Sequence, residues 1–224
     1  PLNIDVSLCE TGDYEQIETE IAKGCKVLYL ETPTNPTIKI TDIERLSIAA
    51  KKVGEYFVEN DIELVYGGAN VGLMKIVADE VLAGGKKVVG IMPHLLLEKE
   101  VEHKGITELI AVDTMSERKE IMSNISDGFI ALPGGLGTLD ELSEIFIYNQ
   151  LRISDKPIGL LNTCGYYDNL LKFIDSGVTY GFIRPEHRQN IIADDNIENL
   201  IKRMYSYEPV VMGKWIKDIK MESN

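Results

Sequence analysis

Short apolar segments alternate along the chain with longer segments in which apolar residues recur at helical spacing. The short segments are rich in Val, Ile and Leu on both faces, which is typical of buried parallel strands. They predict strands at residues 26–30, 62–66, 87–92, 108–112, 128–132, 157–162 and 190–193. Strands that alternate with helices in this way form a parallel sheet with helices on both of its faces.

The longer segments predict helices. Thr41 and Glu44 have the spacing of a capping box at a helix start. One apolar stripe follows on the same helix and consists of Ile43, Leu46, Ala50, Val53 and Phe57. Further helices are predicted near residues 72–82, 117–125, 138–151, 166–176 and 196–205.

These elements predict an α/β fold with a doubly wound parallel sheet of about seven strands. Ligands of such sheets bind at the carboxyl ends of the strands. Residues 26–224 form this domain in the prediction. Residues 1–25 are expected to be an N-terminal extension with a short helix near residues 14–23.

Composition and charge exclude several classes of function. The 224 residues are 44% hydrophobic and carry a net charge of −13, with no run of Lys or Arg. A nucleic-acid partner needs a basic surface, so none is expected. No apolar run approaches the ~20 residues of a membrane span, and no signal peptide is visible. The three cysteines include no Cys-x-x-Cys pair and no two histidines lie four residues apart, so neither a disulfide framework nor a helical zinc pair is expected. A cytoplasmic location fits these features.

The strongest chemical signal is a glycine-rich turn between the predicted strand 128–132 and a helix. It reads Pro133-Gly134-Gly135-Leu136-Gly137-Thr138, with Glu141 one helical turn later. Glycines let the backbone approach a ligand closely, and free amides at a helix start attract an anion. Thr138 adds a hydroxyl donor, so the turn reads as a phosphate cradle. The alternative is a tight turn with a capping box formed by Thr138 and Glu141, and both interpretations remain open.

This turn belongs to neither of the two common nucleotide motifs. Asp140 stands where a dinucleotide fingerprint would need Gly or Ala, and no Gly-Lys-Ser/Thr of a Walker A loop follows.

Two further features fall at the same predicted edge of the sheet. Gly67 and Gly68 follow the predicted strand 62–66, where the alternative is an ordinary tight turn. Arg118 lies near the start of the helix after strand 108–112 and can clamp a phosphate or carboxylate, unless it is an exposed helical arginine. Tyr148, Tyr166 and Tyr167 are expected to be packing residues rather than base-stacking ones.

Together these residues resemble the LONELY GUY family, the cytokinin riboside 5′-monophosphate phosphoribohydrolases, also described as lysine decarboxylase-like. The resemblance covers about residues 50–207. Its motifs are Pro-Gly-Gly-x-Gly-Thr-x-x-Glu at 133–141, Val65-Tyr66-Gly67-Gly68, Gly72-Leu73-Met74, Arg118-Lys119 and Lys156-Pro157.

The resemblance implies a Rossmann-like homodimer that hydrolyses the N-glycosidic bond of a purine nucleoside 5′-monophosphate, giving free base and ribose 5-phosphate. The base is adenine or an N6-substituted adenine. The substrate is an AMP-like nucleotide, and no redox cofactor or metal is implied. The implied catalytic pair is Arg118 and Glu141. The implied substrate-binding residues are Gly67, Gly68, Met115, Lys119, Pro133, Gly134, Gly135, Gly137 and Thr138.

A glycosidic bond of this kind breaks through an oxocarbenium-like ribose. Glu141 would stabilise that charge or activate water, as carboxylates do in other glycoside hydrolysis. Arg118 would bind the phosphate or orient the leaving base, and the amides of the glycine-rich turn would hold the 5′-phosphate.

The chain departs from the family in three places. Met115-Ser116-Glu117 replaces the usual Met-His-x before Arg118, and Ser154 or Asp155 stands where the family often has a His before the Lys-Pro pair. The third departure is larger, because residues of about 3–50 resemble the trans-sulfuration enzymes that use pyridoxal phosphate. Their Schiff-base lysine motif is missing, so pyridoxal chemistry is not expected, and the chain reads as a natural or engineered fusion.

In this fusion, strand 26–30 takes the place of the family's first strand. The turn that follows it, residues 31–36, has two prolines and no glycine, so it is expected to hold an anion poorly and to weaken or abolish turnover. The rival hypotheses are therefore a nucleotide-binding protein without catalysis and an engineered scaffold without selected activity.

Overall fold

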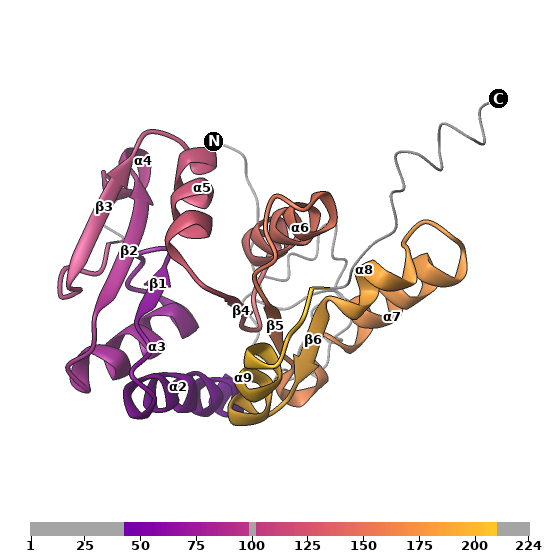
Figure 1. Cartoon of the computed structure of the whole chain (residues 1–224). Coiled ribbons are helices and arrows are strands. Elements are labelled where there is room, and N and C mark those ends of the chain that lie inside the picture. Colours follow the sequence, from indigo (N-terminus) through magenta and orange to yellow (C-terminus); the bar gives the residue numbers. More distant parts are fainter. Residues whose placement is uncertain (1–42, 99–101, 210–224) are drawn as a thin grey trace, which may run out of the picture. The chain divides into compact units, whose positions relative to one another are not determined.

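The computed structural model describes residues 43–98 and 102–209 (Figure 1). Four predictions lie outside these residues, namely the extension 1–25, the strand 26–30, the turn 31–36 and the Thr41 end of the first capping box. Within the described residues, none of the helices is long and apolar enough to cross a membrane.

The first half of the described chain forms a three-stranded parallel sheet. Its strands are β1 (Leu64–Tyr66), β2 (Val88–Pro93) and β3 (Glu108–Val112), in the order β1-β2-β3. Leu64 pairs with Val88, and Val89 pairs with Glu108. The helices of this half are α2 (Ile43–Glu59), α3 (Gly72–Ala83), α4 (His94–Leu97) and α5 (Met115–Ile125).

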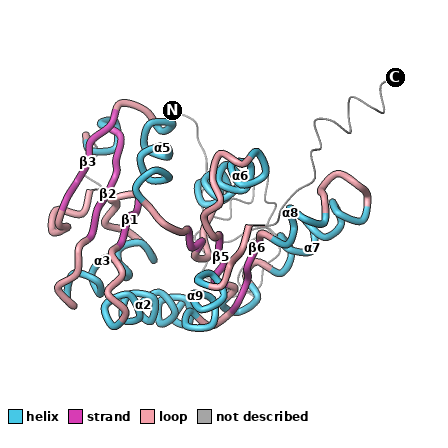
Figure 2. Tube along the Cα trace, viewed as in Figure 1, coloured by secondary structure: helices cyan, strands magenta, loops and turns pink. Residues whose placement is uncertain are grey.

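The second half forms another three-stranded parallel sheet. Its strands are β4 (Phe129–Ala131), β5 (Ile158–Leu161) and β6 (Ile191–Asp194), in the order β4-β5-β6. The helices of this half are α6 (Leu136–Leu151), η1 (Thr163–Gly165), α7 (Asp168–Thr179), α8 (Pro185–Gln189) and α9 (Ile197–Tyr205). Figure 2 shows how strands and helices alternate along the chain.

The predicted α/β class with parallel strands is confirmed. Six of the predicted strands are present, each with ends within two residues of the predicted ones. The count of about seven strands in one sheet is not confirmed, because the described residues form two sheets of three and strand 26–30 lies outside them. The helices α4 and α8 were not predicted, since four or five residues are too few to show a helical period.

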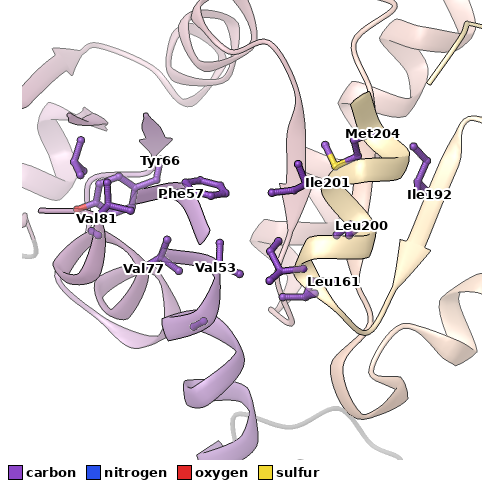
Figure 3. Close-up of a cluster of buried hydrophobic side chains, with 14 residues drawn as sticks. Val53, Phe57, Tyr66, Val77, Val81, Leu161, Ile192, Leu200, Ile201 and Met204 are labelled. Carbon is purple, nitrogen blue, oxygen red and sulfur yellow. The ribbon is translucent and has the colours of Figure 1, made fainter. Parts of the chain in front are cut away.

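One hydrophobic cluster joins elements of both sheets (Figure 3). The predicted stripe of α2 supplies Ala50, Val53 and Phe57, which pack with Val77 and Val81 of α3. The same cluster contains Leu161 of β5, Ile192 of β6, and Leu200, Ile201 and Met204 of α9. Apolar positions in α2 and α9 recur at helical spacing, so each helix presents one face to this cluster.

A second cluster covers the other face of the β4-β5-β6 sheet. Ile158 and Leu160 of β5 pack there with residues of α6 and α7, whereas Leu161 belongs to the first cluster. This alternation is that of a strand buried on both faces. These two clusters pack against the strands of both sheets. The two predicted glycine turns begin at the carboxyl ends of β1 and β4.

Candidate active site

Arg118 is a buried side chain that connects three parts of the fold. Its Nε donates to the carbonyl of Ile91 in β2 at 3.0 Å, and its Nη1 donates to Oε1 of Glu141 in α6 at 2.5 Å. Thr114 caps the helix that carries it by accepting from the Glu117 amide at 3.1 Å. The interpretation of Arg118 as an exposed helical arginine is therefore wrong.

Gly67 makes room for this guanidinium. A Cβ atom at position 67 would overlap the Nη2 atom of Arg118, and the φ angle of Gly67 is not in the left-handed region. The need for glycine here is therefore steric rather than conformational. Gly68, the next residue, does adopt a left-handed φ of 78°, which favours glycine.

Glu141 acts toward Arg118 and not as a helix cap. Helix α6 begins at Leu136, and its N-cap is Gly135, which makes no side-chain cap hydrogen bond. The helix starts two residues before Thr138, so Thr138 and Glu141 do not form the capping box that spacing allowed. About a third of the Glu141 side chain is exposed, whereas its Arg118 partner is almost fully covered.

Lys119 forms a second bridge between α5 and α6. Its Nζ lies 2.7 Å from Glu144 and 3.1 Å from Asp140, on either side of Glu141 along the chain. These two carboxylates, Glu144 first, raise the pKa of Lys119 above its usual value. The two consecutive cations of α5 thus both bind carboxylates of α6, Arg118 that of Glu141 and Lys119 those of Asp140 and Glu144.

The predicted phosphate cradle has one closed and one open side. A Cβ at Gly134 would overlap the Thr138 hydroxyl, which folds back over that residue. Nothing lies within 4 Å of the position that a Cβ would take at Gly135 or Gly137. Because the first amides of a helix have no partner four residues earlier, the open side exposes backbone donors to an anion.

Two tyrosines hold this turn from the other side. Tyr166 donates its hydroxyl to the Gly134 carbonyl at 2.6 Å, and Tyr167 donates to the Leu132 carbonyl at 2.5 Å. Their rings meet edge to face with centroids 5.1 Å apart. The expectation that they are packing residues is thus incomplete, because only the pairing of β4 with β5 brings their hydroxyls to the turn.

A buried polar chain supports the Gly67-Gly68 turn. Tyr66 lies 3.2 Å from Nδ1 of His103, whose Nε2 lies 3.2 Å from Asp79. The His103 amide donates to the Gly68 carbonyl at 2.9 Å. Burial, followed by the charge of Asp79, raises the pKa of Tyr66 to about 12. No local pattern predicted this role of His103, because 35 residues separate it from Gly68.

Met115 and Pro133 lie near the carboxyl edge of the sheets, whereas Lys156 lies away from it. Met115 is the first residue of α5 and is 46% exposed. Pro133 lies in the turn between β4 and α6. Lys156 instead donates to the carbonyls of Ser123 and Asn124 at 2.7 and 3.3 Å, so it caps the C-terminal end of α5, opposite to Arg118. Among the described residues, no cluster of three or more His, Cys, Asp or Glu side chains is arranged to hold a metal.

A cavity of about 350 Å³ lies at that far end of α5. Its walls include Glu120, Asn124, Tyr148 and Asp155, and none of the predicted site residues lines it. Lys156 directly precedes Pro157 and β5, so the cavity adjoins the amino end of that strand. The candidate active site is therefore the pair of glycine turns around Arg118 and Glu141, and not this cavity.

Solved structures share the fold. A molybdenum cofactor binding protein from Rippkaea orientalis is 22% identical with a TM-score of 0.54, covering 76% of this chain and 90% of that one. The molybdenum cofactor carrier protein of Chlamydomonas reinhardtii is 17% identical with a TM-score of 0.54, covering 73% and 90%. At these identities the likeness concerns the fold alone.

The N-terminal part of the chain matches a different family. Residues 1–87 fit the model described as Cys/Met metabolism PLP-dependent enzyme. This match supports the fusion inferred from the sequence and extends beyond the boundary near residue 50 that the motifs suggested.

The larger part of the chain has relatives that are 45% and 47% identical. The cytokinin riboside 5′-monophosphate phosphoribohydrolase LOG1 of Arabidopsis thaliana is 45% identical over 161 residues, which cover 72% of this chain and 76% of LOG1. The probable cytokinin riboside 5′-monophosphate phosphoribohydrolase LOGL2 of Oryza sativa subsp. japonica is 47% identical over 161 residues. These cover 72% of this chain and 66% of LOGL2. Residues 74–204 match the family model described as possible lysine decarboxylase. The chain thus belongs to this family, together with the plant cytokinin riboside 5′-monophosphate phosphoribohydrolases.

Proposed function

We propose that this chain hydrolyses the N-glycosidic bond of a purine nucleoside 5′-monophosphate to free base and ribose 5-phosphate. The observation that carries the proposal is the 2.5 Å contact between Arg118 and Glu141, placed between the Gly67-Gly68 turn and the turn at 133–138. An anion-binding turn beside a partly exposed carboxylate is what a phosphorylated sugar with a developing positive charge requires.

The phosphate end of the substrate is assigned to the start of α6. The amides of the turn, among them those of Gly135, Gly137 and Thr138, bind the 5′-phosphate, with the positive end of the helix dipole behind them. The Thr138 hydroxyl lies over Gly134 and adds a donor on the same side. Binding the phosphate at this turn places the ribose toward Glu141, one helical turn further along α6.

The reacting end of the substrate is assigned to Glu141. As the bond from C1′ to the base nitrogen breaks, positive charge develops on the ribose, and the Glu141 carboxylate stabilises it. Water adds to C1′, its hydroxyl remains on ribose 5-phosphate, and its proton leaves with the base. Arg118 fixes one oxygen of Glu141 and adds positive charge on the side where the nucleotide enters.

The first test is incubation with AMP, followed by chromatography for adenine and ribose 5-phosphate. Adenosine is the control substrate, because it lacks the phosphate that the α6 turn would hold. Release of adenine from AMP but not from adenosine supports the proposal. A thermal shift with AMP and no release of adenine would instead favour a nucleotide-binding protein without catalysis.

We infer that the base is adenine or an N6-substituted adenine, as the names of the plant relatives suggest for their own substrates. The assay run on AMP, GMP and N6-isopentenyl-AMP ranks the bases by kcat/KM. A preference for GMP would contradict the assignment.

We further propose that the chain acts as a homodimer in the cytoplasm. Helix α6 exposes Leu136, Ile147 and Leu151 to 85%, 50% and 52%, and helical spacing places the three on one face. Apolar patches on a helix of this kind mark interaction sites, and a second copy is the commonest partner. Light scattering on wild type and Ile147→Lys tests this, with a dimer expected only for the wild type.

The N-terminal fusion is expected to lower the turnover of the nucleotide. Residues 31–36 lie outside the described part of the structure, and their lack of glycine supports lower turnover than in an intact family member. Side-by-side kinetics with Arabidopsis LOG1 test this point. Equal kcat/KM values would contradict the weakening and leave the reaction itself unaffected.

A further inference from the structure

The hydroxyls of Tyr166 and Tyr167 fix two successive parts of the 133–138 turn. Tyr166 donates to the Gly134 carbonyl, and Tyr167 donates to the Leu132 carbonyl. Both tyrosines follow η1 at the carboxyl end of β5, the strand beside β4. The side chain of Asn162 orients them by accepting from the Tyr167 amide at 2.7 Å.

The Tyr166 bond fixes the direction of one amide. A trans peptide is planar, so the carbonyl of Gly134 and the N–H of Gly135 point in opposite directions. With that carbonyl bonded to Tyr166, the Gly135 N–H is turned away from the tyrosine. Two successive glycines otherwise give this peptide unusual freedom to rotate, since neither has a Cβ to limit it.

The geometry of the turn agrees with this direction. Thr138 fills the space beside Gly134, whereas no atom lies within 4 Å of a Cβ position at Gly135. Gly135 is also the N-cap of α6, with extended φ and ψ of −89° and −154°. Its N–H therefore stands beside the free amides of the first helical turn, where a phosphate would be held.

Tyr167 makes an equivalent bond with a different consequence. The carbonyl of Leu132 shares its peptide unit with Pro133, which has no N–H. The Tyr167 bond therefore anchors the turn but directs no donor. The two adjacent tyrosines form a natural pair for comparison, because each loses one hydroxyl and keeps its ring on mutation to phenylalanine.

We propose that Tyr166 is a positioning residue for the 5′-phosphate of the substrate. It holds the Gly134–Gly135 peptide in the orientation that presents the Gly135 amide to the phosphate. The inference rests on the proposed function, and it assigns phosphate affinity to a side chain that does not itself touch the substrate.

The experiment compares Tyr166→Phe with Tyr167→Phe in the full chain. Calorimetry measures binding of ribose 5-phosphate, and steady-state kinetics measure KM and kcat with AMP. In Tyr166→Phe the Gly135 amide is no longer held toward the phosphate, so one hydrogen bond to the phosphate is lost. We expect roughly 3- to 10-fold weaker binding of ribose 5-phosphate and a similar rise in KM, with kcat nearly unchanged. For Tyr167→Phe we expect a lower Tm and unchanged binding and KM.

A second measurement keeps the test valid if Tyr166→Phe is destabilised. In wild type, the ¹H–¹⁵N resonance of Gly135 should move on titration with ribose 5-phosphate, and this movement should shrink in Tyr166→Phe. Unchanged binding in Tyr166→Phe, or equal losses in both variants, would overturn the inference while the reaction stands. A wild type that binds no ribose 5-phosphate would overturn the inference, and one that also releases no adenine from AMP would overturn the proposed reaction.

Discussion

Gly67 and Arg118 are in direct contact, because the guanidinium of Arg118 occupies the space that a side chain at position 67 would need. The residues come from different elements, the end of β1 and the first turns of α5, and 51 positions of sequence separate them. The contact brings Arg118 to the carboxyl edge of the sheet, where its Nη1 reaches Glu141.

Gly67→Ala should displace Arg118. The backbone at position 67 accepts alanine, but the new Cβ would overlap Nη2, so the guanidinium must shift away from Glu141. We expect at least a tenfold fall in kcat/KM with AMP, since a misplaced group near the chemistry costs up to about 10²-fold. Gly105→Ala is the matched control, because its Cβ would make only an ordinary contact with His103. Equal kcat/KM in both variants would contradict the steric role.

Glu141→Gln should separate catalysis from folding. Gln keeps an oxygen that accepts from Arg118, and α6 does not depend on Glu141 for its cap, so the variant should fold. The lost carboxylate should lower kcat by at least ~100-fold, which is typical of one missing catalytic group. Glu198→Gln, an exposed carboxylate on α9, serves as the control. A folded Glu141→Gln protein with full kcat would rule out the catalytic role.

Arg118→Lys tests the planar guanidinium. One ammonium cannot reproduce the Nε bond to Ile91 and the Nη1 bond to Glu141 at their separate positions. We expect a clear loss of kcat/KM and a destabilisation of about 1–3 kcal/mol, because a buried polar partner remains unsatisfied. Urea melts and AMP kinetics measure the two effects. A variant that is unchanged in both would show that the positive charge alone is needed.

The sequence predicted the positions of the two glycine turns better than the contacts that surround them. Glycine turns after two apolar strands, with the rule that ligands bind at carboxyl ends, were enough to place Gly67 and Gly134 at strand ends. The pairing of Arg118 with Glu141 came from the family motif, because no local spacing relates residues 23 positions apart. The structure brings the two side chains into direct contact, and their catalytic role stays a prediction.

The parts that could not be predicted depend on contacts between distant segments. Glycine at the N-cap gives α6 no side-chain start signal, while Thr138 and Glu141 imitate one three residues later. The hydroxyl of Tyr166 bonds a carbonyl 32 residues earlier in the sequence, and only the pairing of β4 with β5 brings them together. Such bonds leave no periodic trace in the chain.

Stability should fall at high pH because of Tyr66. Burial and Asp79 raise the pKa of Tyr66 from its usual value of 10.0 to about 12, so the unfolded chain loses this proton first as pH rises. Between pH 10 and 12 the native state then holds more protons than the unfolded state, and the free energy of unfolding decreases with pH. Tyr66→Phe should show a shallower decrease in urea melts at pH 9, 10 and 11. Tyr205→Phe, which changes an exposed tyrosine, is the control, and an equal slope in all three proteins would refute the assignment.

Lys156→Met should affect stability and leave the reaction unchanged. The ammonium of Lys156 donates to the carbonyls of Ser123 and Asn124 at the carboxyl end of α5, where a positive charge also interacts favourably with the negative end of the helix dipole. Its loss should lower the free energy of unfolding by about 1–2 kcal/mol. Because Lys156 lies at the opposite end of α5 from Arg118, kcat and KM with AMP should match those of the wild type at temperatures well below Tm. Lys172→Met, at an exposed lysine of α7, controls for the loss of one charge. A raised KM in Lys156→Met, with an unchanged KM in Lys172→Met, would contradict this prediction. It would mean that Lys156, at the far end of α5 from Arg118, affects nucleotide binding.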